Sequence, residues 1–136
     1  MKWMKSLVVL TFIGLSSAAH ADSDAVRATI LGQMNALRAG DAESAYAYAA
    51  PDLKRLFPTA ERFISMVRKG YAPVTHASAP RFLRSQSKAD GTFAQEVAFR
   101  DNEGQPWRAL YMLARQPDGE WRITGCYLRK VEGTDA

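Results

Sequence analysis

Residues 92–131 read TFAQEVAFRDNEGQPWRALYMLARQPDGEWRITGCYLRKV, and this stretch decides the fold. Apolar and polar residues alternate along it with a period of two, which is typical of strands with one buried face. Two runs that end in glycine, NEG at 102–104 and PDG at 117–119, interrupt the alternation as three-residue hairpin loops would. The stretch therefore predicts three consecutive antiparallel strands, over residues 92–101, 105–116 and 120–131.

The loop lengths also predict the strand register. With three residues in each loop, Phe99 lies opposite Trp107, and Tyr111 lies opposite Gly125. By the same rule Ala109 faces Tyr127. Every odd-numbered position then falls on one face, which must be the covered one because a one-residue slip would expose it. The residues of this face are Phe93, Val97, Phe99, Trp107, Tyr111, Leu113, Trp121, Ile123 and Tyr127.

The residues before this stretch change to a helical period. Val26, Ile30, Met34 and Leu37 form one apolar stripe of a helix that we expect to be capped within 22–24 and to end at Gly40. Further segments predict a small-residue helix over 42–50 that Pro51 ends, and a short apolar turn over 53–58. They also predict a helix over 59–70, from Thr59 to Gly70, and an edge strand over 79–86 that Pro80 interrupts. Helices followed by a meander predict an α+β fold with three N-terminal helices on a four-stranded antiparallel sheet.

The N-terminus has the pattern of a secretion signal. Lys2 and Lys5 precede an apolar run at 7–15, and Ala19-His20-Ala21 fits the A-x-A rule for cleavage. We expect a signal peptide over 1–21, cleaved after Ala21, and a single domain over 22–136 in the periplasm or outside the cell. The apolar run is shorter than the roughly 20 residues that span a bilayer, so no stable membrane insertion is expected after cleavage.

Charge and composition exclude several classes of function. The formal net charge of the whole chain is +4, and it falls to +2 when the two lysines of the expected signal are removed. No basic run remains, which argues against nucleic acid as a partner. Cys126 is the only cysteine, and His76 is the only histidine after the expected cleavage site, so neither a metal nor another cofactor is expected. His76 has no identifiable partner, and no catalytic residue is predicted.

The predicted register gathers a candidate ligand site on the covered face. Gln95, Tyr111 and Gly125 form one row there, in which two polar side chains need partners and a glycine leaves space. We expect a pocket for a small, partly apolar ligand, with Tyr46 and Tyr71 as lids. The alternative is that Gln95 and Tyr111 bond each other or a helix, and that both tyrosines are ordinary core.

The opposite face of the sheet predicts an interface. Its apolar centre consists of Leu110, Met112, Cys126 and Leu128. Arginines surround this centre, as in a modest protein–protein interface. We expect a homodimer or another partner here, and the alternative is a partly solvated sheet.

Two stretches resemble a known superfamily. ALRAGDAE at 36–43, continuing to Pro51-Asp52, resembles the opening helices of nuclear-transport-factor-like and ketosteroid-isomerase-like proteins. FISMVRKGYAPV at 63–74 looks like a signature of uncharacterised secreted proteobacterial domains. The resemblance implies a curved, cone-like sheet with an apolar pocket and dimers formed through the sheet. No catalytic acid carries over, so we expect a non-catalytic ligand-binding domain; a partner-binding module and an isomerase-like or cyclase-like enzyme remain alternatives.

Overall fold

A computed structural model describes residues 16–133 of the chain, so most of the expected signal peptide lies outside the described residues. A helical half precedes a sheet, as predicted. The helices are α1 (Ser16–Arg38), α2 (Ala42–Ala47), α3 (Pro51–Leu56), α4 (Ala60–Gly70) and the 3₁₀ helix η1 (Ala72–His76). The strands are β1 (Ser78–Ser87), β2 (Thr92–Arg100), β3 (Pro106–Arg115) and β4 (Trp121–Lys130).

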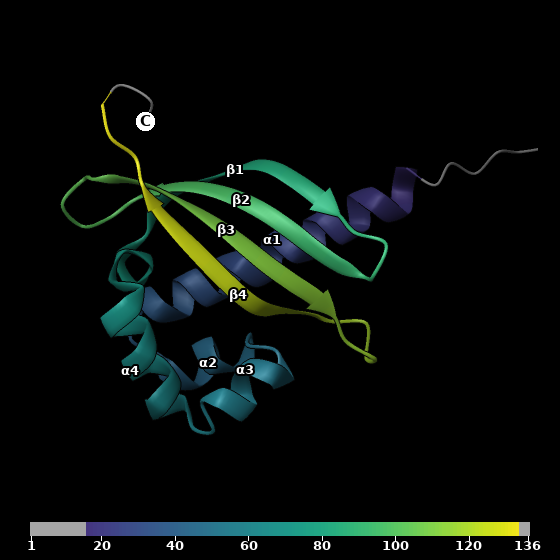
Figure 1. Cartoon of the computed structure of the whole chain (residues 1–136), viewed down its shortest axis with the longest axis horizontal. Coiled ribbons are helices and arrows are strands. Elements are labelled where there is room, and N and C mark those ends of the chain that lie inside the picture. Colours follow the sequence, from purple (N-terminus) through teal and green to yellow (C-terminus); the bar gives the residue numbers. More distant parts are fainter. Residues whose placement is uncertain (1–15, 134–136) are drawn as a thin grey trace, which may run out of the picture.

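The four strands form one antiparallel meander in the order β1-β2-β3-β4. Helix α1 lies diagonally behind the sheet, and α2, α3 and α4 lie beyond β4 (Figure 1). The predicted α+β fold is therefore confirmed. The β2–β3 register is also as predicted, with Phe99 opposite Trp107 and Phe93 opposite Leu113. Gly104 and Gly119 have φ values of 77° and 85°, the left-handed conformation that both hairpin loops require.

The predicted register is wrong beyond the middle of β4, because the strand contains a bulge. Leu113 pairs with Ile123, but Met112 pairs with Gly125, so Thr124 is an extra residue in the ladder. The Thr124 hydroxyl donates a hydrogen bond of 3.1 Å to the carbonyl of Met112 and holds the bulge in place. Because one extra residue exchanges the two faces of a strand, every side chain after Thr124 points opposite to the prediction.

Helix α1 carries the predicted apolar stripe. Val26, Ile30, Met34 and Leu37 are all buried, and the helix contacts β2 and β4. Its beginning differs from the prediction: residues 22–24 are not caps but lie inside the helix, which starts at Ser16. The residues from 16 to 21 contain neither glycine nor proline, and their alanines favour continuation of the helix.

The segment between α1 and α4 contains two short helices where one helix and an apolar turn were predicted. Asp41 caps α2 by accepting a hydrogen bond of 3.1 Å from the backbone N–H of Ser44. Pro51 occupies the first turn of α3, where its missing N–H costs nothing. The turn predicted over 53–58 is therefore mostly helical.

The residues that link α2 to α3 attach to the edge of β4. The N–H of Ala50 donates to the carbonyl of Ile123 at 2.8 Å, and the N–H of Ile123 donates to the carbonyl of Tyr48 at 2.9 Å. Ala49 thereby forms an isolated parallel bridge with Ile123. This bridge holds the small helices beside the sheet.

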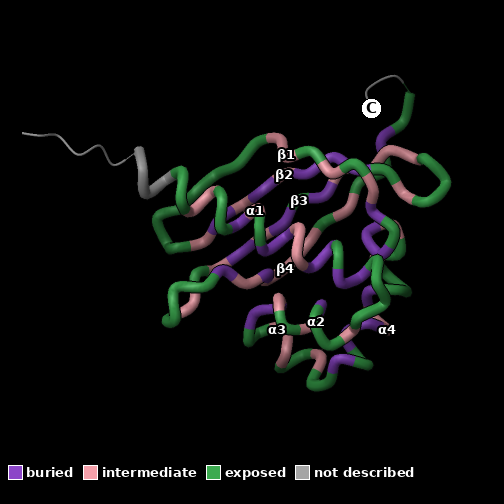
Figure 2. Tube along the Cα trace, turned by 180° about the vertical axis from the view of Figure 1, so that it is seen from behind, coloured by how far each residue is buried: buried purple, intermediate pink, exposed green. Residues whose placement is uncertain are grey.

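The core lies between the sheet and the helices. Seen from behind, buried segments follow α1 and the strands that it overlies (Figure 2). The largest fully buried side chains include Tyr111, Ile30, Met34 and Leu113. Of the helices in the described part of the chain, none has the length and apolar character needed to span a bilayer.

Candidate functional site: an apolar cavity with a buried tyrosine hydroxyl

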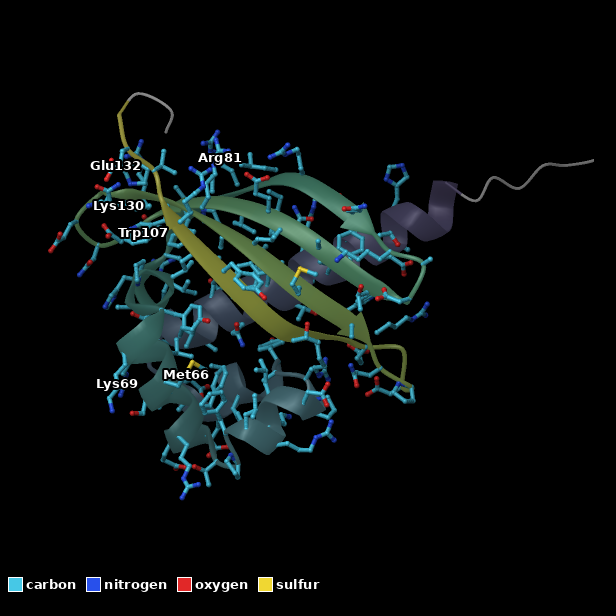
Figure 3. The ribbon with its side chains drawn as sticks, in the orientation of Figure 1. Met66, Lys69, Arg81, Trp107, Lys130 and Glu132 are labelled. Carbon is cyan, nitrogen blue, oxygen red and sulfur yellow. The ribbon has the colours of Figure 1, made fainter. Side chains whose placement is uncertain are left out.

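A cavity of about 70 Å³ lies where α1, α4 and η1 meet the inner face of β3 and β4. Most of its wall is apolar. The lining residues are Gln33, Leu37, Leu53, Phe63, Met66, Val67, Tyr71, Val74, Tyr111, Ile123, Gly125 and Cys126. Leu53, Met66 and Tyr71 are only half-buried, so the cavity lies near the surface at these three side chains. Met66 projects from α4 on the side nearer the sheet (Figure 3).

Tyr111 belongs to this wall, and its hydroxyl is buried. Its side chain is 1 % exposed, and among the described residues no group forms a hydrogen bond of good geometry with its Oη atom. The Cys126 thiol interacts with this hydroxyl, but a neutral thiol is a weak hydrogen-bond partner. Burial is the main reason that the pKa of Tyr111 lies well above its usual value, so the hydroxyl keeps its proton and can donate it.

Cys126 lines the cavity because of the Thr124 bulge. The predicted register put this residue on the opposite face, whereas the structure pairs it with Tyr111 on the inner face. Burial raises the pKa of its thiol to about 12. The thiol is therefore neutral and a poor nucleophile at physiological pH.

Gln33 belongs to the cavity wall, although sequence reasoning missed it. Its Nε2 donates to the carbonyl of Ala45 at 3.1 Å and ties α1 to α2. The sequence held a signal for it, because Gln33 lies three residues after Ile30 and four before Leu37, within the apolar stripe. A polar residue on a buried helix face indicates a hydrogen-bonding role.

Gln95 is fully buried, as predicted, but it lies outside the cavity. Its Nε2 donates to the carbonyl of Glu96 at 2.9 Å and to that of Arg84 at 3.3 Å. A bulge in β1 between Phe82 and Ser85 turns the carbonyl of Arg84 out of the ladder, and the second bond gives this carbonyl a donor. Gln95 thus has a structural role and does not share a site with Tyr111.

The remaining predicted ligand residues divide in the same way. Tyr71 lines the rim of the cavity, whereas Tyr46 does not, since its hydroxyl donates to the carbonyl of Phe57 at 2.7 Å and its ring packs against Phe63. Gly125 reaches the cavity only with its backbone. Gly125 pairs with Met112 of the uncovered face, so a side chain here would point away from the cavity, and its Cβ would meet open space.

The predicted interface residues fall on two faces. Leu110 is 40 % exposed on the uncovered face, and Met112 is half-buried beside it. Cys126 and Leu128 instead pack against the core on the inner face. The bulge replaces them on the uncovered face with Tyr127, which is 69 % exposed.

The cavity is chemically suited to binding. None of its lining residues carries a carboxylate, an imidazole or an amine. His76 is exposed in η1, and within residues 16–133 no three His, Cys, Asp or Glu side chains are placed to hold a metal ion. The polar side chains of the wall are those of Tyr111, Cys126 and Gln33.

Comparison with known proteins gives a family for the chain. No curated protein and no solved structure matches it significantly. A family model described as a domain of unknown function, DUF4864, matches residues 19–136. The match extends from the first turn of α1 past the end of β4 and includes every cavity residue. The chain therefore belongs to the DUF4864 family.

Proposed function

We propose that this protein is an exported, non-catalytic binding domain that holds the apolar end of a small ligand in the cavity, with Tyr111 donating a hydrogen bond to an acceptor atom of the ligand. The buried hydroxyl of Tyr111, whose one neighbouring partner among the described residues is the weakly bonding Cys126 thiol, carries the proposal. A buried hydroxyl without a partner costs about 1–3 kcal/mol. A ligand that supplies an acceptor would recover this free energy on binding.

The volume of the cavity limits the ligand. A dry cavity of about 150 Å³ lined by apolar side chains can hold benzene, and this cavity has about 70 Å³. It therefore fits a short apolar group with one acceptor atom, while the rest of a larger ligand stays outside the rim. Met66 lies at that rim, and its unbranched side chain can change rotamer to enlarge the opening.

Binding suits this lining better than catalysis does. An isomerase-like enzyme needs a base near the reacting atom, and the ionisable groups of the wall with shifted pKa values, Tyr111 and Cys126, both hold their protons more tightly than usual. Helices on one face of an open sheet, with an apolar cavity between them, agree with the resemblance to nuclear-transport-factor-like and ketosteroid-isomerase-like proteins. The signal-like N-terminus supports export. Membership of that superfamily and a periplasmic location are parts of this proposal.

Native mass spectrometry is the first test. Protein purified from a periplasm is sprayed under native conditions and again after denaturation, and we expect excess mass that is lost on denaturation. Acetone and propane are then titrated by NMR, since both have three carbon atoms and they differ in the acceptor oxygen. Acetone should bind more tightly, and Tyr111→Phe should remove that difference.

Tyr46→Phe is the matched control, because Tyr46 lies outside the cavity and its hydroxyl has a partner in the protein. This variant should bind both probes as the wild type does. The proposal fails if the wild type carries no extra mass and binds neither probe. It also fails if Tyr111→Phe leaves the preference for the ketone unchanged.

A further inference from the structure

The uncovered face of the sheet carries an excess of positive charge. Figure 1 looks onto this face, and no helix of the described chain crosses it. Strand pairing places six arginines and one glutamate there, which we call the arginine face, and Glu120, directly before β4, forms an ion pair with Arg122 at 3.9 Å. Its charged residues are Arg81, Arg84, Arg100, Arg108, Arg122, Arg129 and Glu96.

Two irregularities in the strands build the densest part of this charge. A bulge in β1 between Ser78 and Arg81 pairs Arg81 with Ala98, and Ala98 also pairs with Arg108. The Thr124 bulge pairs Arg108 with Arg129 in turn. Three arginines thus lie in one row across four strands.

The one glutamate does not neutralise this row. Glu96 accepts from Arg84 at 3.2 Å and from Arg108 at 3.1 Å, so a single carboxylate already serves two guanidinium groups. Within residues 16–133, no carboxylate forms an ion pair with Arg81, Arg100 or Arg129.

Apolar side chains and hollows accompany the charge. Leu110 and Tyr127 pair with each other and are the large apolar residues most exposed on the sheet. A hollow of about 450 Å³ at the end of the sheet has Arg81, Arg100 and Arg108 in its wall, together with Phe99, Trp107 and Val131. Another of about 250 Å³ lies beside Leu110 and Tyr127. The face is therefore shaped to receive side chains.

The edges of the sheet are less suited to a partner. Pro80 and two bulges interrupt β1, which hinders pairing with an added strand. On β4, the segment from Tyr48 to Ala50 already occupies the backbone of Ile123. A partner of this sheet would therefore lie on its face.

We propose that the arginine face binds an acidic segment of another protein, whose carboxylates enter the hollow among Arg81, Arg100 and Arg108 and whose apolar side chains cover Leu110 and Tyr127. Guanidinium groups bind carboxylates with two parallel hydrogen bonds, and arginine and tyrosine are enriched at protein interfaces. A second copy of this chain would bring one excess of arginine against another, and like charges disfavour that pairing. A lipid surface would be smooth and would leave the hollows unfilled.

The test uses a labelled peptide of alternating glutamate and tyrosine, with fluorescence anisotropy at low salt as the readout. The double variant Arg81→Glu/Arg129→Glu should bind it about tenfold or more weakly, because both changes reverse charges that face the peptide. Arg68→Glu/Lys69→Glu is the matched control. It makes the same change in net charge on exposed residues of α4, and Figure 3 shows Lys69 far from Arg81.

Each other outcome contradicts the proposal. Equal losses in the two double variants would show an effect of net charge alone. Binding of vesicles rich in phosphatidylglycerol, without binding of the peptide, would identify a lipid surface as the occupant. Sedimentation of the free protein as a dimer that Arg81→Glu/Arg129→Glu dissociates would identify a second copy. If that variant does not fold, Arg81→Gln/Arg129→Gln must still weaken peptide binding more than Arg68→Gln/Lys69→Gln does.

Discussion

Removing one oxygen atom from Tyr111 should stabilise the ligand-free protein. The hydroxyl is buried, and among the described residues only the Cys126 thiol, a weak partner, lies beside it. A buried hydroxyl that lacks a good partner costs about 1–3 kcal/mol relative to an apolar replacement of the same shape. Tyr111→Phe also enlarges the cavity by roughly 10 Å³, which at about 24 cal/mol per Å³ costs about 0.2 kcal/mol. The net expectation is a gain of about 1–3 kcal/mol in the free energy of unfolding.

The same change at Tyr46 should have the opposite sign. Its hydroxyl donates a 2.7 Å hydrogen bond to the carbonyl of Phe57, and the loss of such a bond costs about 1 kcal/mol. Both variants and the wild type are refolded from urea to remove bound molecules, and their unfolding is followed by tryptophan fluorescence. A loss of stability in Tyr111→Phe as large as that in Tyr46→Phe would show that the Tyr111 hydroxyl is bonded within the protein. The argument for a ligand would then lose its main support.

Three further predictions concern the β4 strand. The folded-state pKa of Cys126 is about 12 and its unfolded value is 9.0, so the stability that the buried neutral thiol contributes is complete below pH 9 and is lost as the pH rises toward 12. Cys126→Ala should therefore flatten the pH dependence of the free energy of unfolding over this range, measured by urea denaturation. An unchanged slope would contradict the burial of the thiol. Gly125→Leu should keep the fold and the binding of acetone by NMR, because Gly125 pairs with Met112 of the uncovered face and the new side chain would point away from the cavity. A loss of binding would place that side chain in the cavity. Deletion of Thr124 should turn Cys126 and the half-buried Leu128 toward water, at about 1 kcal/mol for the leucine. Unchanged urea denaturation would show that the bulge does not fix the faces of the strand.

Those parts of the fold that depend on local patterns could be predicted from the sequence. The stripe from Val26 to Leu37 needs only one buried helix face, and Gly104 and Gly119 fix two hairpins whose loops leave little freedom. The β2–β3 register followed from the first loop alone. In each case, residues close in the sequence determine the geometry.

Features that depend on distant contacts could not be predicted. The bridge of Ala49 to Ile123 joins residues far apart in the chain, and no local pattern marks either one. The separation of Gln95 from the cavity depends on the carbonyl that the β1 bulge turns toward it. The small volume of the cavity depends on side chains from several elements.

The Thr124 bulge connects the two proposed sites and had a signal that was misinterpreted. An isolated glycine inside a strand often marks a bulge, and Gly125 follows Thr124 directly. Its presence therefore indicates the bulge better than it indicates space for a ligand. The single extra residue places Cys126 beside Tyr111 on the inner face, and it places Tyr127 and Arg129 on the outer face. With a regular ladder, the cavity would lose its thiol and the arginine face would lose its exposed tyrosine. Both sites therefore depend on one bulge. Strand bulges are common next to functional sites, where they change the direction in which side chains point.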